Sequence, residues 1–233
     1  MKAMIFAAGK GTRLRPLTDT LPKALIPYRG TPLIEHVITR LLDFGITQIV
    51  VNVHHLGNMI KDFLSSKNNF GIDIQISNES DSLLDTGGGL KKAFPLLQDS
   101  SPILLHNTDI ISTLDFADML EFHKKSGALA TTAVRTRQTG RYLLFNNDML
   151  LCGWMNTKTG ETKPPELNPA TLQNLAFSGV HIIEPRIRNY FPDENVFSII
   201  DLYLSVMNKE KISGYLHDNT EWKDMGKIED FEK

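Results

Sequence analysis

The chain has 233 residues, of which 41% are hydrophobic and 22% charged, and its formal net charge is −2. This length suits one large α/β domain over residues 1–233 that buries about 70% of its unfolded surface. The balanced charge argues against nucleic-acid and membrane-surface binding, and no apolar stretch approaches the ~20 residues of a membrane span. The apolar run at residues 4–8 is also too short for a signal peptide, so we expect a cytoplasmic protein. Its single cysteine, Cys152, is expected to be a buried or partly buried structural thiol.

Apolar periodicity predicts alternating strands and helices in the first half of the chain. Strands are expected at residues 2–8, 48–53, 73–77 and 103–105, and helices at 34–42, 56–66 and 86–97. Because these strands alternate with helices and are largely apolar, they favour a mostly parallel sheet with helices on both faces, an α/β fold.

The second half of the chain mixes helices with a predicted hairpin. Helices are expected at 115–126 and 198–208, and strands at 129–134, 141–145, 149–154, 176–183 and 212–216. The turn at 146–148 predicts a hairpin between two of these strands. Residues 156–174 are expected to form a surface excursion near the substrate end, and 221–233 a last turn and helix.

Residues 6–23, FAAGKGTRLRPLTDTLPK, combine glycines with Arg and Lys directly after a predicted strand. Main-chain N–H groups at glycines can approach an anion such as phosphate closely, and the cations add positive charge. Two common phosphate motifs do not fit. A Walker A loop would need glycine at Met4, and a dinucleotide fingerprint would need a third glycine at Leu14. The alternative is a glycine turn whose Lys and Arg side chains are solvated and bind no ligand.

The stretch resembles the G-x-G-T-R-L-x-P-L-T signature of the sugar-phosphate nucleotidylyltransferases, followed by P-K at 22–23. The resemblance implies a Rossmann-like three-layer sandwich of the nucleotide-diphospho-sugar transferase type. It also implies that Arg13 grips the β- and γ-phosphates and that Lys23 lies near the α-phosphate and the sugar phosphate, both as catalytic residues. The nucleotide contacts implied here are Ala8, Gly9, Gly11, Thr12 and Arg13.

Two aspartates are candidate metal ligands. Asp109 follows the strand at 103–105, where an Asx turn or helix cap would explain it equally well, and Asp224 alone is one more surface aspartate. The family has N-G-D and W-x-D-x-G at these places, which implies that both residues bind Mg²⁺. No general base is assigned, because a sugar 1-phosphate, with a second pKa near ~6, is already a nucleophile at neutral pH.

Two further segments suggest the base and sugar pockets. Residues 84–90, LDTGGGL, begin a helix whose free N–H groups can read a ligand, although a capped, tightly packed helix is equally consistent. They resemble the L-E-T-G-G-G-I segment of short uridylyltransferases, and 177–180 resemble the family's F-S-G-I segment, where the alternative is a packing glycine. The implied contacts are Thr86, Gly87 and Gly88 for the nucleotide, and Asn78, Glu79, Ser178 and Gly179 for the sugar phosphate. His54, His55 and Lys163 receive no role.

The resemblance implies an enzyme that joins a nucleoside triphosphate to a sugar 1-phosphate, giving a nucleotide sugar and pyrophosphate, with Mg²⁺ as cofactor. Among short members the sequence resembles N-acetylmuramate-1-phosphate uridylyltransferases, which implies UTP and a role in cell-wall or surface-polysaccharide synthesis. Mannose-1-phosphate guanylyltransferase and phosphocholine cytidylyltransferase are the alternatives. A non-catalytic nucleotide-sugar-binding subunit is a third reading, although all four expected charges of the reaction centre are present. We expect a monomer or weak homodimer.

Overall fold

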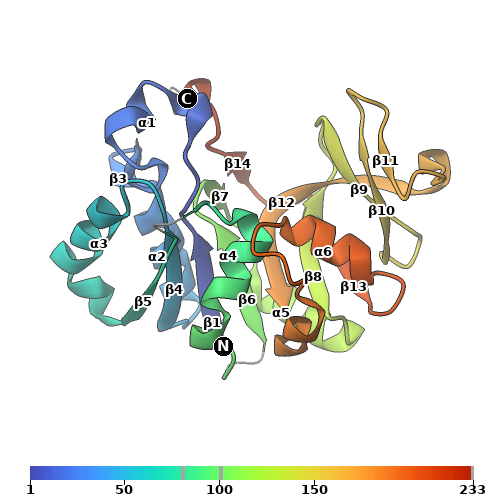
Figure 1. The fold of residues 1–233 in the computed structure, drawn as a ribbon, viewed down its shortest axis with the longest axis horizontal. Coiled ribbons are helices and arrows are strands. Elements are labelled where there is room, and N and C mark those ends of the chain that lie inside the picture. The colour runs from blue at the N-terminus through green and yellow to red at the C-terminus, as the bar shows by residue number, and fades with distance from the viewer. Residues whose placement is uncertain (80–81, 100–101, 232–233) are drawn as a thin grey trace.

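The computed structural model of the chain describes residues 1–79, 82–99 and 102–231. Its centre is a ten-stranded sheet in the order β11-β10-β9-β12-β6-β1-β4-β5, with β8 paired to β12 and β13 (Figure 1). The expected α/β fold is confirmed. The sheet is mixed, with its parallel and antiparallel strands divided between two halves.

The parallel half is built from the strands predicted in the first part of the chain. They are β1 (Lys2–Phe6), β4 (Gln48–Val53), β5 (Asp73–Asn78) and β6 (Ile103–Asn107). β1 lies between β4 and β6, and β5 is the edge strand next to β4. Since all four are parallel, the loops that follow them meet at one edge of the sheet.

The antiparallel half is organised around one long strand, β12 (Gln173–Ile183). Its start pairs with β9 and its end with β6 and β8, so β12 joins the two halves (Figure 1). The other strands are β8 (Ala130–Arg135), β9 (Arg141–Phe145), β10 (Leu151–Asn156), β11 (Thr162–Lys163) and β13 (Ile212–Leu216), which is parallel to β8.

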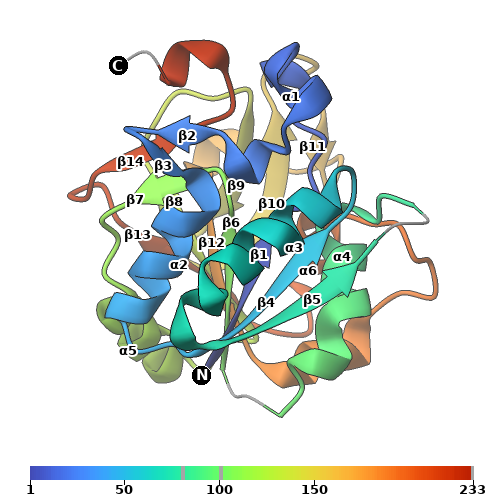
Figure 2. The same cartoon turned by 90° about the vertical axis from the view of Figure 1, so that its left-hand side faces the viewer.

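Helices cover both faces of the sheet because alternate residues of its strands face opposite ways. The helices are α1 (Leu17–Thr20), α2 (Leu33–Asp43), α3 (Gly57–Ser66), α4 (Asp85–Ala93), α5 (Phe116–Ser126) and α6 (Ile199–Val206). Met4 of β1 packs in the cluster with α4 and α6, whereas Ile5 packs in the cluster with α2, α3 and α5. Figure 2 shows α2 and α3 next to each other, beside β4 and β5.

Short elements complete the fold. Single 3-10 turns span Thr12–Leu14, Lys23–Leu25, Asn68–Gly71, Phe94–Leu96, Pro169–Thr171, Pro185–Tyr190 and Ile228–Asp230. Two small two-stranded sheets pair β2 (Pro27–Tyr28) with β3 (Thr31–Pro32), and β7 (Ile110–Ser112) with β14 (Trp222–Asp224). None of the helices in the described ranges is long and apolar enough to cross a lipid bilayer.

The prediction of a turn and helix at 221–233 is wrong in its first part, where the structure has the strand β14. The segment extends because Trp222 and Met225 are held by distant partners: the Trp222 indole donates to the Ser178 carbonyl, and Met225 is fully buried against Tyr28 and Leu33. Only the 3-10 turn remains helical, and residues 232–233 lie outside the described range. The predicted helix at 86–97 ends at Ala93 because Pro95 breaks the helical hydrogen bonding.

Candidate active site

The glycine-rich loop follows β1 and is anchored at both ends. The Ala7 N–H donates to Asn52 Oδ1 at 2.8 Å, and the Thr18 hydroxyl donates to the Gly11 carbonyl at 2.9 Å. Gly11 has a φ of 62°, and a Cβ there would lie 2.8 Å from Thr18 Cγ2, so another residue would be strained and crowded. At Gly9, by contrast, a Cβ would meet nothing within 4 Å, which leaves the middle of the loop open to a ligand.

The pairing of β7 with β14 brings the two candidate metal ligands together. Asp224 is the register partner of Ile110, and the Met225 N–H donates to the Asp109 carbonyl at 2.9 Å. Lys23, which is almost fully buried, forms an ion pair with Asp109 through Oδ2. Residues 23, 109 and 224, which are far apart in the sequence, therefore meet in space.

The Asp224 carboxylate lies in an unusual environment for an aspartate. Its Oδ1 is buried and has no hydrogen-bond partner among the described residues. Burial raises the pKa of Asp224, and the charge of Asp109 raises it further, against the opposing effect of the cations Lys23, Arg13 and Arg137. Both the orphaned oxygen and the two repelling carboxylates are features that a bound cation would relieve.

The number of carboxylates at Asp109 and Asp224 determines which cation these residues could hold. The described residues contain no group of three His, Cys, Asp or Glu side chains that could hold a metal by themselves. Mg²⁺ needs only one or two carboxylates, because waters and substrate phosphates supply its other ligands. Asp109 and Asp224 thus fit Mg²⁺ held jointly by protein and nucleotide.

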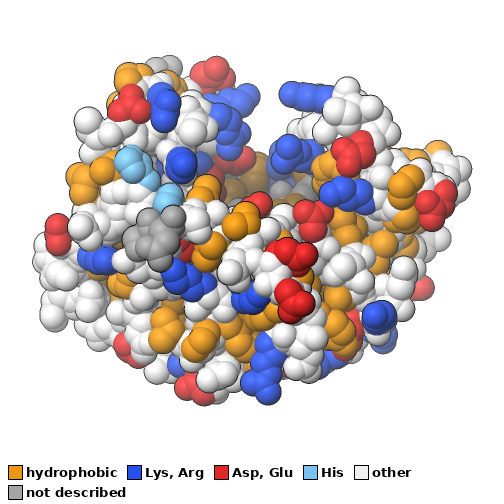
Figure 3. Space-filling model, in the orientation of Figure 1, with side chains coloured by type: hydrophobic (Ala, Val, Ile, Leu, Met, Phe, Trp, Pro, Cys, Tyr) orange, Lys and Arg blue, Asp and Glu red, His pale blue; other side chains and the backbone are white. Residues whose placement is uncertain are grey.

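A cleft opens between the two halves of the molecule, and Lys and Arg side chains lie on both of its walls (Figure 3). Three cavities line this region. The glycine-loop cavity, about 460 Å³, includes Ala8, Gly9 and Glu79, and the β9–β12 cavity, about 500 Å³, includes residues of β9, β10, β11 and α6. Both share Asp85 and Thr86. The Asp224 cavity, about 360 Å³, is lined by Arg13, Arg137, Trp222, Lys223, Asp224, Gly226, Lys227 and Asp230.

Arg13 reaches the Asp224 cavity because position 226 has no side chain. A Cβ on Gly226 would lie 2.9 Å from Arg13 Nη2 and 2.8 Å from Asp224 Oδ1. The glycine loop thus places its arginine against the second aspartate. Thr12 follows Gly11 in the same 3-10 turn as Arg13 but does not line any of the three cavities.

Glu79, which was expected to contact the sugar phosphate, lines the glycine-loop cavity and does not line the β9–β12 cavity. It is 1% exposed, and its carboxylate accepts from Asn52 Nδ2 at 2.6 Å and from the Leu84 N–H at 3.2 Å. The network from Ala7 through Asn52 to Glu79 supports the floor of that cavity. Asn78, at the exposed end of β5, lines neither cavity.

The N–H groups of Gly87 and Gly88, expected to meet the nucleobase, are used inside the protein. Both donate to the Phe197 carbonyl, at 2.9 Å and 3.2 Å. A Cβ on Gly88 would lie 2.0 Å from the Asn195 carbonyl oxygen, so these glycines let α4 approach the chain that precedes α6. Thr86 accepts from the Ile199 N–H through Oγ1, and it lines both cavities.

Ser178 and Gly179 do not line the three cavities. Ser178 is fully buried, and its hydroxyl is 2.7 Å from His217 Nε2. Gly179 has a φ of 79° at an irregularity of β12, where a Cβ would lie 2.5 Å from Ile110 Cγ1. Their contacts support β7 and β14, and therefore the two aspartates, from beneath.

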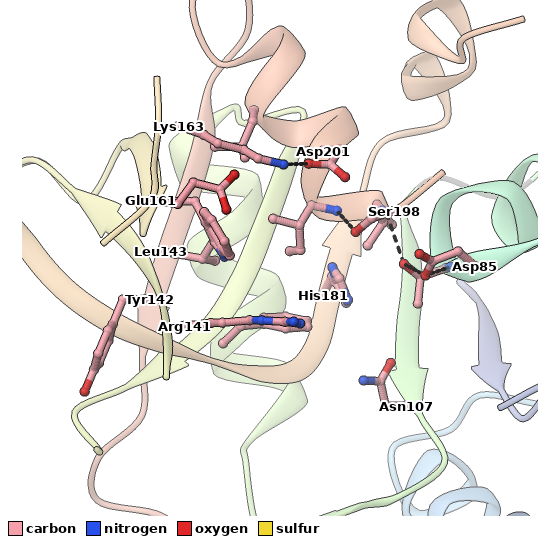
Figure 4. A pocket seen from close by; sticks show the side chains of 16 residues that line it. Asp85, Asn107, Arg141, Tyr142, Leu143, Glu161, Lys163, His181, Ser198 and Asp201 are labelled. Atoms are coloured by element: carbon pink, nitrogen blue, oxygen red, sulfur yellow. Dashed lines mark hydrogen bonds and ion pairs between the residues drawn. The ribbon is translucent and has the colours of Figure 1, made fainter. Parts of the chain in front are cut away.

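Sequence reasoning missed most of the β9–β12 cavity (Figure 4). Lys163 pairs with Asp201 at 2.9 Å and lies 5.4 Å from the Trp154 ring centroid, while Arg141 comes from β9. His181 contacts the Tyr203 hydroxyl at 2.9 Å, and burial lowers its pKa to about 3, so the ring is neutral. These residues come from separate strands and one helix and form no local motif. The segments 84–90 and 177–180, which the sequence singled out, contribute only Asp85, Thr86 and Phe177 to its lining.

Comparison with known proteins identifies the family. The nucleotidyl transferase family profile matches residues 2–233. N-acetylmuramate alpha-1-phosphate uridylyltransferase of Neisseria meningitidis serogroup B is 33% identical over 98% of this chain and 94% of its own length. UTP–glucose-1-phosphate uridylyltransferase of Synechocystis is 30% identical over 99% of this chain, which spans 61% of that longer relative.

Solved structures share the fold at low identity. A putative glucose-1-phosphate thymidylyltransferase from Bacillus anthracis superposes with a TM-score of 0.83 at 17% identity, covering 100% of this chain and 92% of that one. HddC from Yersinia pseudotuberculosis, complexed with GMP-PN, superposes with a TM-score of 0.78 at 19% identity, and the match covers 99% of this chain and 96% of that one. The family resemblance seen in the sequence is thereby confirmed: the chain belongs to the nucleotidyl transferase family and is an enzyme of the NDP-sugar pyrophosphorylase type.

Proposed function

We propose that this sugar-1-phosphate nucleotidylyltransferase uses UTP and N-acetylmuramate 1-phosphate, or a related hexose 1-phosphate, with Mg²⁺ as its cofactor. The observation that carries the proposal is the meeting of Lys23, Asp109 and Asp224 beside the glycine loop. The choice of substrate rests on the relative from Neisseria, which is similar over nearly the whole of both chains.

The reaction requires a bond to form at the α-phosphorus of the triphosphate. An oxygen of the sugar phosphate attacks in line, and the bond from the α-phosphorus to the bridging oxygen of the β-phosphate breaks, releasing pyrophosphate. Lys23 would bring the two reacting phosphates together, and Arg13 would hold the leaving pyrophosphate. Asp109 and Asp224 would hold Mg²⁺, which when bound neutralises charge on the phosphates.

The cavities divide the substrates in a consistent way. Among the described residues, the glycine-loop cavity is lined by two carboxylates, Glu79 and Asp85, and by no cation, so it suits the uncharged nucleoside better than the phosphates. The adjoining β9–β12 cavity combines charged and aromatic side chains, a lining that suits a sugar ring with its hydroxyl groups. We propose that this single domain acts as a monomer or weak homodimer.

A substrate panel tests the proposal. Pyrophosphate release should be measured for each of UTP, GTP, CTP and dTTP with N-acetylmuramate, mannose and glucose 1-phosphates and with phosphocholine. We expect the highest kcat/KM for UTP with N-acetylmuramate 1-phosphate. A preference for another pair would replace the substrate assignment, and inactivity with every pair would favour a binding subunit.

Removing one carboxylate tests the metal assignment. We expect Asp224→Asn to reduce kcat by at least about 1,000-fold, because charge neutralisation at the phosphates is the main catalytic contribution. Its thermal unfolding should match that of wild type. Asp73→Asn, at the exposed edge strand, is the matched control and should keep full activity. An Asp224→Asn enzyme with near-normal turnover would refute the assignment.

A further inference from the structure

Arg137 lies in the segment between β8 and β9, and no motif singled it out. Its guanidinium lies over Trp222, with Cζ 4.6 Å from the ring centroid, and it lines the Asp224 cavity together with Arg13 and Asp224. Trp222 immediately precedes Lys223 and Asp224 in β14, so the same strand fixes both Arg137 and the second aspartate.

The guanidinium of Arg137 has few partners within the protein. Its Nη2 donates to the Phe177 carbonyl at 3.4 Å, a long contact, and its Nε is buried without a hydrogen-bond partner among the described residues. A guanidinium carries five N–H donors, and buried donors are normally satisfied. Arg137 therefore keeps unused donor capacity beside a cavity, while stacking on Trp222 restricts its motion.

The charge of the Asp224 cavity indicates which kind of ligand the unused N–H donors of Arg137 could bind. Four cationic side chains, Arg13, Arg137, Lys223 and Lys227, face two carboxylates, Asp224 and Asp230. The part of the glycine-loop cavity that the structure describes has, in contrast, two carboxylates and no cation. The Asp224 cavity is thus the positive end of the cleft, where the most highly charged part of a nucleotide fits best.

We propose that Arg137 is a catalytic residue that donates hydrogen bonds to the β- and γ-phosphates of the triphosphate, the pair that leaves as pyrophosphate. Arg13 approaches the same cavity from the glycine loop, so two arginines from opposite halves of the molecule would hold the leaving group between them. Planar guanidinium groups suit such bidentate phosphate contacts. The role in turnover rests on the proposed nucleotidyl transfer.

Arg135 provides a matched control for the experiment. Its guanidinium also lies near Trp222, at 5.7 Å from the centroid, and both of its terminal nitrogens make long contacts of 3.4 Å to the Thr220 carbonyl. Unlike Arg137, it does not line the Asp224 cavity. Arg137→Gln and Arg135→Gln each remove a cation that contacts the same ring. Arg137→Lys retains the charge without the planar fork.

The measurement is binding of inorganic pyrophosphate in the presence of Mg²⁺, by calorimetry, together with KM for pyrophosphate in the reverse reaction. Arg137→Gln should weaken pyrophosphate binding about 10–100-fold and raise KM for pyrophosphate in proportion, with KM for the nucleotide sugar unchanged. Arg137→Lys should recover part of the affinity. Arg135→Gln should stay within about two-fold of wild type.

Unchanged pyrophosphate affinity in Arg137→Gln would overturn the proposal, as would a wild-type protein that does not bind pyrophosphate. An equal loss in Arg137→Gln and Arg135→Gln would also overturn it, because it would indicate packing on Trp222. If wild type turns over no substrate pair but loses pyrophosphate affinity in Arg137→Gln alone, the proposed reaction fails while the assignment of Arg137 as a phosphate-binding residue holds.

Discussion

Gly226, two residues after Asp224, is a position at which Arg13 of the glycine loop comes close to the segment that carries Asp224. The neighbours that a Cβ would meet are the Arg13 guanidinium and the Asp224 carboxylate, both at the ends of flexible side chains. A methyl group can therefore be accommodated, but only if these two functional groups move. A substitution at Gly226 should therefore change activity with little change in stability.

We predict that Gly226→Ala raises KM for the triphosphate and lowers kcat/KM by about 10-fold or more, because an arginine displaced from the phosphates loses a charge-assisted hydrogen bond. The melting temperature should change by no more than a few degrees. Steady-state kinetics and thermal unfolding on the same preparation check both parts. Wild-type kcat/KM in this variant would show that Arg13 is not confined by Gly226 during turnover.

The residues of the candidate site differ in how far the sequence could predict them. Arg13, Lys23, Asp109 and Asp224 belong to local motifs, and the structure brings them together. Gly87 and Gly88 belong to an equally visible motif, yet their N–H groups bind Phe197. A motif identifies residues under constraint, but only the fold shows whether the constraint is packing or ligand contact.

At the scale of elements, α4 shows what the glycine run contributes. Gly88 faces the Asn195 carbonyl and Gly87 the Phe197 ring, while Gly89 lies against Glu79 and Asn52. A helix with side chains at these positions could not lie this close to both the segment before α6 and the floor of the glycine-loop cavity. The run thus sets the position of α4 relative to two other elements.

We predict that Gly88→Ala lowers the free energy of unfolding by at least about 2 kcal/mol, because a methyl group 2.0 Å from a main-chain oxygen must push two elements apart. Gly9→Ala, whose methyl would meet nothing within 4 Å, should change it by no more than about 0.5 kcal/mol. Urea unfolding measures both. Equal stability of the two variants would contradict the packing role assigned to Gly88.

Element prediction succeeded where the pattern is local and failed where pairing is remote. The apolar runs that became β1, β4 and β6 are visible in the sequence because these strands are buried on both faces, whereas the edge strand β5 is only partly buried. β14 has three residues, and it is extended because it pairs with β7, more than a hundred positions earlier. No window of neighbouring residues contains that information.

At the scale of the whole molecule, the two halves are joined across a core that contains buried imidazoles. His106 and His181 lie on the paired strands β6 and β12, and burial lowers their pKa values to about 4 and about 3. Burial also lowers the pKa of His123 and that of His217, the latter to about 4. All four rings are hydrogen-bonded in the folded protein.

These shifts predict a stability that depends on pH. Between the folded pKa values and the ordinary value of 6.5, the unfolded chain binds protons that the folded protein does not, so stability is full above pH ~6.5 and falls as the pH drops. Lowering the pH from 7.5 to 5.5 should cost about 3 kcal/mol for His106 and His181 together, with His123 and His217 acting in the same direction. Urea unfolding at these two pH values measures the change. Asp224→Asn should show a fall at least as large, since the raised pKa of Asp224 acts in the opposite direction and the variant lacks this group. Equal stability at both values would mean that the buried rings bind protons in the folded protein as readily as in the unfolded chain, and that the junction of β6 and β12 is wetter than its packing indicates.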